Sequence, residues 1–177
     1  MTRRVIFVPD DYWTHPPKEN TMHFSPAAAG DLRRASAFIK HHAYANRDGQ
    51  NAILLEALEA QRAGEFVEGI LVTYDAIVPQ LITPAGQRCM AEMILTFAEN
   101  TGLDADWNRA ARLLIAYGEN RRDDMNEIIR ETDDVSPTIV AILDIYATIL
   151  PTLHTPFGMD IIERALRTLS AKEVEPR

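Results

Sequence analysis

The sequence predicts an all-α protein made of two tandem four-helix units of antiparallel hairpins, preceded by a short extended arm. Three observations predict this. Apolar residues recur with a helical period, four Ser-Pro or Thr-Pro pairs precede such segments, and one segment recurs at a shift of about 72 residues. The predicted boundaries are 1–26 for the arm, 27–102 for the first unit and 103–177 for the second, which we expect to form one compact domain together.

The arm differs in composition from the rest of the chain. Residues 4–8 are rich in β-branched and aromatic side chains and predict one short strand, which Pro9 and two aspartates close. Residues 12–24 contain two adjacent prolines and no helical period, so we expect an irregular segment laid over the helices. An exposed strand can pair with a partner or a second copy. The candidate partner-binding residues are therefore Tyr12, Trp13, His15 and His23.

Helix starts are marked by Ser25-Pro26, Thr83-Pro84, Ser136-Pro137 and Thr155-Pro156. In each pair the hydroxyl is expected to cap a free N–H of the first turn, while proline takes the first helical position. Proline-directed phosphorylation is the alternative reading of these pairs, and capping is favoured. With these anchors, helices are predicted at about 27–46, 51–62, 65–78, 84–100, 105–118, 123–133, 137–150 and 156–172.

The internal repeat aligns residues 70–86 with residues 142–158, and nine of the seventeen positions are identical. The shared pattern includes two prolines and a glycine at fixed offsets, which makes coincidence a poor explanation. In each copy a proline ends the third helix and a Thr-Pro pair starts the fourth. A looser match relates residues 43–53 to residues 116–128. Positions retained in both copies are explained by folding and are not counted as an active site.

Composition limits the possible classes of function. The net charge of −8 disfavours broad binding to nucleic acid or anionic membranes. The longest apolar stretch has twelve residues and contains Asp144, whereas a membrane-spanning helix needs about 20. A single cysteine allows no internal disulfide, and the N-terminus lacks a signal-peptide core. The expected location is the cytoplasm.

Catalytic and metal-binding patterns are missing from the sequence. None of the five histidines has a spacing that directs two ligands at one metal ion. Cys89 lies in a predicted helix among apolar neighbours, where a thiol is usually inert packing. Glycine-rich phosphate loops and the G-x-S-x-G nucleophile pattern do not occur. We therefore predict no catalytic residue, cofactor or metal.

The expected function is non-enzymatic: binding of another protein, or of a second copy, through the helical-repeat surface and the arm. One alternative is a DNA-binding regulator with a helix-turn-helix near residues 91–113, in which Ala98 and Gly102 set the turn and the next helix carries Asn108, Arg109 and Arg112. The acidic charge makes nucleic acid an improbable partner. A second alternative is an α-helical enzyme or small-molecule binder with a pocket between the two halves.

Overall fold

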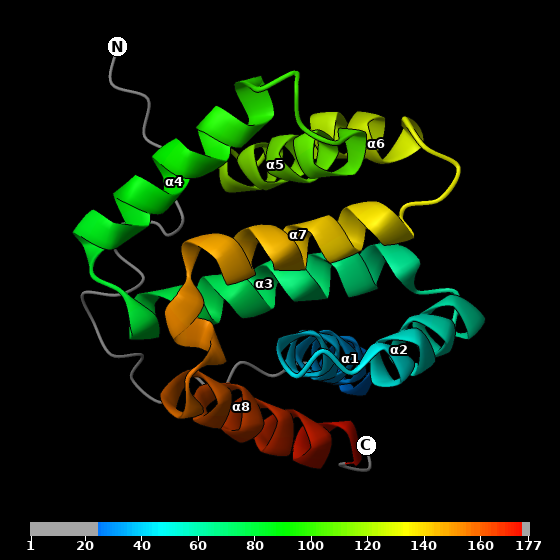
Figure 1. Cartoon of the computed structure of the whole chain (residues 1–177). Coiled ribbons are helices and arrows are strands. Elements are labelled where there is room, and N and C mark those ends of the chain that lie inside the picture. Colours follow the sequence, from blue (N-terminus) through cyan, green and yellow to red (C-terminus); the bar gives the residue numbers. More distant parts are fainter. Residues whose placement is uncertain (1–24, 175–177) are drawn as a thin grey trace. The chain divides into compact units, whose positions relative to one another are not determined.

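The computed structural model describes residues 25–174, which form eight α-helices, one short 3-10 helix and no strand (Figure 1). The predicted all-α class is therefore confirmed. The helices are α1 Pro26–Ala43, α2 Arg47–Glu59, α3 Ala63–Leu81, α4 Pro84–Glu99, α5 Ala105–Gly118, α6 Arg122–Arg130, α7 Ser136–Ile149 and α8 Pro156–Val174, with the 3-10 helix η1 at Pro151–His154. The predicted strand and residues 1–24 of the predicted arm lie outside the described residues.

Three of the four predicted hydroxyl caps are present. The Ser25 hydroxyl accepts a hydrogen bond from the N–H of Ala28, and Thr83 and Thr155 do the same for the third residue after each of them. Ser136 differs, because the helix begins at this residue and its hydroxyl makes no cap bond. Instead, the carboxylate of Asp134 accepts the backbone N–H of Ser136 at 2.9 Å. The prediction that Ser136 is the N-cap is therefore wrong.

Three described helix ends share one left-handed backbone conformation: those of α1, of α2, where Gln61 has a φ of 54°, and of α5. The ends of α1 and α5 agree most closely. Ala45 follows α1 with a φ of 52°, and Asn120 follows α5 with a φ of 54°. After both α1 and α5, two backbone N–H groups donate hydrogen bonds to carbonyl oxygens of the last turn, with N···O distances of 2.9 and 2.8 Å. This arrangement satisfies carbonyls that a helix end would otherwise leave free. It also explains why α1 ends at Ala43 rather than at the predicted residue 46.

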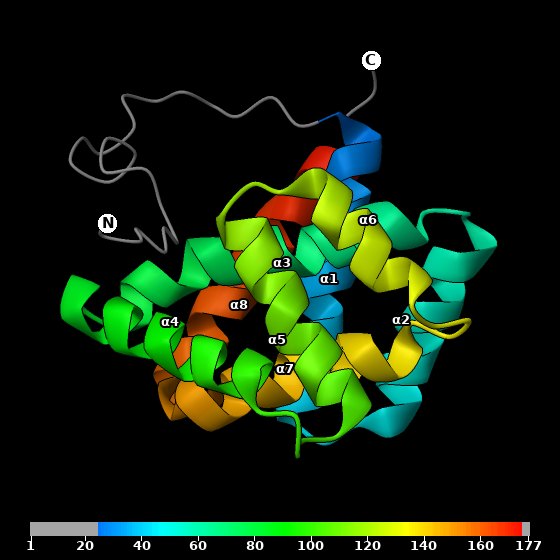
Figure 2. The ribbon, with the colours of Figure 1, turned by 90° about the horizontal axis from the view of Figure 1, so that it is seen from above.

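The chain divides into two compact units by its internal contacts. The first unit consists of residues 82–151, and the second consists of the described residues up to Leu81 together with those from Thr152 onward. In the first unit α5 contacts α4, α6 and α7, as Figure 2 shows. In the second unit α1 contacts α2, α3 and α8 (Figure 1), so the first and last described helices lie side by side.

The units in space differ from the predicted units in sequence by an exchange of fourth helices. The predicted division falls between residues 102 and 103, whereas α4 packs on α5 and α8 packs on α1. A short link at residues 100–104 joins α4 to α5, which favours contact between these two helices. Both points where the chain crosses between units lie inside the repeated segments at 70–86 and 142–158. The tandem duplication itself remains a prediction.

The cores of both units are apolar and closely packed. In the second unit Phe38 meets Phe66 edge to face, with ring centroids 5.3 Å apart, and in the first unit Phe97 meets Trp107 in the same way. Gly69 allows the close approach of α3 to α1, because a Cβ at this position would lie 3.3 Å from the carbonyl oxygen of Asp31. None of the described helices combines the length and apolar character that crossing a membrane requires.

Candidate functional site

A buried ion cluster joins three helices of the second unit. Asp31 on α1 accepts hydrogen bonds from Arg34 at 2.7 Å and from Arg62, at the start of α3, at 2.5 to 3.0 Å. Glu56 on α2 accepts from Arg34 at 3.1 Å and from Arg33 at 2.8 Å. Asp31 and Arg34 are only 4% and 8% exposed, respectively. The cluster therefore fixes α2 and the start of α3 against α1.

The carboxylates of this cluster are held in their charged form. Burial alone would raise the pKa of Asp31, but hydrogen bonds from Arg62 and Arg34 lower this pKa below its ordinary value. Burial likewise opposes ionisation of Glu56, and the hydrogen bonds from Arg34 and Arg33 outweigh it and lower the pKa of Glu56. Neither group is therefore poised to exchange protons near neutral pH, which speaks against acid–base catalysis here.

The first unit holds a matching cluster. Arg109 donates to Asp106 at 2.5 Å and to the hydroxyl of Thr138 at 3.0 Å, and that hydroxyl donates to Asp106 at 2.8 Å. The Nε atom of Arg109 lies 3.9 Å from a carboxylate oxygen of Glu131. Thr138 is on α7, so this cluster also joins separate elements of its unit.

The two clusters correspond at a constant spacing of 75 residues. Asp31, Arg34 and Glu56 correspond to residues 106, 109 and 131, which are again Asp, Arg and Glu. The left-handed residues at 45 and 120 and the starts of α2 and α6 have the same spacing. The Nε atoms of Arg34 and of its counterpart Arg109 are both buried and make no hydrogen bond. Because both units contain it, we interpret the cluster as a device for holding helices together.

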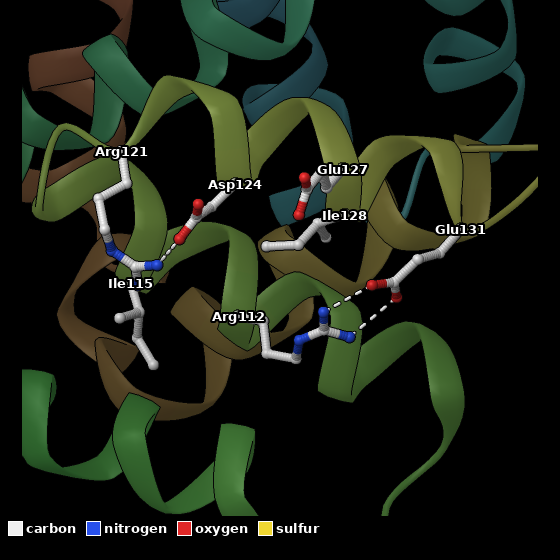
Figure 3. A pocket seen from close by; sticks show the side chains of 7 residues that line it. All are labelled: Arg112, Ile115, Arg121, Asp124, Glu127, Ile128 and Glu131. Atoms are coloured by element: carbon white, nitrogen blue, oxygen red, sulfur yellow. Dashed lines mark hydrogen bonds and ion pairs between the residues drawn. The ribbon is translucent and has the colours of Figure 1, made fainter.

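A shallow pocket of about 290 Å³ lies on the first unit between α5 and α6 (Figure 3). Arg112 makes a two-pronged pair with Glu131, at 2.5 and 2.8 Å, and Arg121 is paired with Asp124 and with Glu119. These pairs are visible on opposite sides of the pocket in Figure 3, apart from Glu119, which is not drawn. The remaining lining residues are Ile115, Glu127 and Ile128.

Both arginines of this pocket are thus engaged by carboxylates of their own unit, and an incoming anion would have to displace these partners. A second pocket, of about 350 Å³, lies on the other unit and is lined by Lys40, Glu163, Leu166 and Arg167. Its lysine is paired with Glu163 at 2.7 Å. Among the described residues that line them, neither pocket presents a set of convergent groups that would indicate a reaction.

The outer face of α2 has a different character. This helix of 13 residues buries only Ala57, although its sequence contains three leucines. Leu55 is 58% exposed and Leu58 is 49% exposed, and the spacing of three residues places both on one side of the helix. We call these two residues the leucine face. Tyr44, 59% exposed, lies just before the same helix.

The other unit has charged residues at the corresponding positions. With the spacing of 75, Tyr44, Leu55 and Leu58 correspond to Glu119, Arg130 and Asp133, all of them exposed. Arg130 is the last residue of α6, so this helix forms with a charged side chain at the position of Leu55. Asp133 lies beyond the end of α6, whereas Leu58 lies inside α2. Helix formation alone does not require a leucine at position 55. The leucine face could not be recognised from the sequence, because the apolar run of α2 has the pattern of a core helix. Comparison at this spacing is the signal that finds it.

The other predicted residues are distributed as follows. Tyr12, Trp13, His15 and His23 lie outside the described residues. Cys89 lies in α4 but is exposed, so its prediction as buried packing is wrong; the helix turns this position to solvent. Within the described ranges no group of histidine, cysteine, aspartate and glutamate residues forms a metal-binding cluster.

The residues of the predicted helix-turn-helix make contacts inside the first unit. Asn108 donates to the carbonyl of Ala98 at 2.8 Å, Arg109 belongs to the ion cluster of the first unit, and Arg112 is paired with Glu131. These contacts do not favour contact with bases, and DNA binding stays a prediction. Comparisons of the chain with models of known protein families, with curated proteins and with solved structures found no match.

Proposed function

We propose that this protein acts by binding another protein, and that the leucine face of α2 is its contact surface. The observation that carries the proposal is the difference between the units. At corresponding exposed positions, one unit has leucines and the other has charged residues. Apolar side chains that the fold does not need, and that remain in water, are characteristic of interaction surfaces.

The size of the contribution fits a recognition role. Burying a leucine completely is worth about 1.5–3 kcal/mol, and about half of each side chain remains to be covered here. Covering both leucines would contribute about 1.5–3 kcal/mol, or roughly 10-fold to 150-fold in affinity. A contribution of this size can anchor a larger interface. We propose that the predicted arm at residues 1–26 contributes the rest of that interface.

The test is a comparison of three tagged proteins in pull-downs at moderate salt. Leu55→Arg introduces the residue that the other unit has at this position, so it removes the apolar contact with little risk to the fold. Met93→Arg on α4 is the matched control, because Met93 is also an exposed apolar residue, at 42%. We expect one or more partner proteins to be retained by the wild type and by Met93→Arg but not by Leu55→Arg. Equal retention by all three proteins would rule out the leucine face.

A further inference from the structure

The charges around the leucine face identify the kind of partner that fits it, on the assumption that the proposed function holds. The arginines near α2 are drawn inward, because Arg33 and Arg34 bind Glu56, and Arg62 binds Asp31. Arg62 also lies 3.7 Å from a carboxylate oxygen of Glu65, so the three arginines face three carboxylates and their positive charge is largely neutralised. The potential at the outer face of α2 is therefore set by the side chains of α2 that point to solvent.

The end of α2 that carries the leucines is negative. Glu59 is the last residue of the helix, it is exposed, and it makes no ion pair within the described part of the chain. The last turn contains no basic residue, so the negative end of the helix dipole is not compensated by the side chains of α2. Glu59 itself is placed where the dipole disfavours a carboxylate, so local helix stability does not explain it.

The opposite end of α2 is close to neutral. Arg47 and Asp48 are adjacent, exposed and of opposite sign. Leu55 is eight residues beyond Arg47, which is about 12 Å along the helix axis. This distance exceeds the screening length of about 8 Å at physiological salt, so Arg47 does little to offset the negative charge beside the leucines.

We infer that the occupant of the leucine face is a basic amphipathic helix of another protein, with apolar side chains on Leu55 and Leu58 and a lysine or arginine over the C-terminal end of α2. Helices that dock in this way present apolar anchors at positions three and four residues apart. A cation beside Glu59 would compensate both its carboxylate and the helix dipole. A second copy fits less well, because each chain has a net charge of −8 and would bring the same negative end.

The experiment uses the full chain and three labelled peptides in a fluorescence-anisotropy titration. One peptide is an amphipathic helix of leucine and lysine, about five turns long; the second has glutamate in place of lysine, and the third has the basic composition with its leucines redistributed around the helix. We expect the basic amphipathic peptide to bind at least about tenfold more tightly than either of the others, and its affinity to fall as salt is raised.

Variants locate the binding on the protein. Leu55→Arg is expected to lower the affinity for the basic amphipathic peptide at least about tenfold. Glu59→Lys leaves the leucines in place and is also expected to lower this affinity. Met93→Arg, with the same charge change as Leu55→Arg, controls for the added positive charge and is expected to leave the affinity within about twofold. Circular dichroism of each variant checks that its helical content is unchanged.

The outcomes separate the two proposals. If Leu55→Arg loses its partners in the pull-down but the acidic peptide binds as well as the basic one, the leucine face is a contact surface and the inferred charge of the partner is wrong. The same conclusion follows if light scattering shows a wild-type dimer that Leu55→Arg dissociates. The inference is overturned if no peptide binds, or if Leu55→Arg and Met93→Arg lower the affinity for the basic peptide equally.

Discussion

Substitution of Asp31 by asparagine tests the reasoning about the buried ion cluster. The carboxylate accepts hydrogen bonds from Arg34 and from Arg62 and is only 4% exposed. The asparagine side chain would keep the shape but lose the negative charge, which leaves Arg34, 8% exposed, with Glu56 as its remaining acidic partner. A buried cation would thus lose its closest counter-ion, and we expect a marked loss of stability.

The magnitude follows from the burial of the partners. Removing one partner of a buried ion pair lowers the free energy of unfolding by about 3–5 kcal/mol. The side chain of Arg62 is 32% exposed, so water recovers part of that loss and we expect about 3 kcal/mol. With a urea m-value of about 2 kcal/mol/M, the midpoint of unfolding should fall by about 1.5 M. The assay is urea unfolding at pH 7, followed by circular dichroism.

The matched control is Asp106→Asn in the other unit. The Asp106 side chain is 30% exposed, and its arginine also binds Thr138, so we expect a loss of only about 1 kcal/mol, or about 0.5 M in urea. Equal losses in the two variants would refute this reasoning, because the greater exposure of Asp106 and the hydrogen bond of Arg109 to Thr138 both predict a smaller loss for Asp106→Asn.

The lowered pKa of Asp31 also predicts that the stability difference between the wild type and Asp31→Asn depends on pH. The pKa of Asp31 is lowered in the folded protein, so its ionised form contributes stability above the ordinary value of 3.8, and this contribution is lost as the pH falls through the lowered pKa. The stability difference between the wild type and Asp31→Asn should therefore be complete at about pH 5 to 7 and should shrink below about pH 4. A difference that stays constant down to about pH 2.5 would contradict this assignment.

Three further predictions concern single positions. Gly158→Ala should cost about 1–3 kcal/mol in thermal unfolding, because its Cβ would lie 2.5 Å from the carbonyl oxygen of Leu153, whereas Gly86→Ala meets nothing closer than 3.3 Å and should cost less. Leu55→Arg should change the unfolding free energy by no more than about 0.5 kcal/mol, and a larger loss would mean that the fold needs this leucine. Glu131→Gln should cost less than about 1 kcal/mol in urea unfolding, because its pair with an arginine is exposed.

Helix positions were largely predictable because their signals are local. A Ser-Pro or Thr-Pro pair acts within one turn, and the predicted starts at residues 84 and 156 agree with the structure, as does the whole span of α5 at 105–118. Ser136 shows the limit of this reasoning. The N-cap of α7 is Val135, and the carboxylate of Asp134 accepts the backbone N–H of Ser136. A motif of one residue pair does not include the residues before it.

The candidate site was much less predictable. Arg62 binds a carboxylate 31 residues away, and no periodicity relates two such positions. The leucine face belongs to a helix that was predicted at residues 51–62 and lies at 47–59. The apolar run of this helix has the same pattern whether it is covered or left in water. The charged residues at the corresponding positions of the other unit carried the missing information, once the spacing of 75 was known from the helix ends.

The sequence by itself determined the all-α class and the approximate positions of the helices, because capping, proline and the helical period act over a few residues. Proline marked starts better than ends: the prediction that Pro79 ends the third helix is wrong, because Pro79 lies inside α3, which continues to Leu81. The repeated segment was also visible there, with the duplication it predicts. Only the tertiary structure decided that α8 packs on α1 and α4 on α5, and that Cys89, Leu55 and Leu58 face water. Partner choice among helices depends on how whole faces fit together, and local sequence rules do not contain that information.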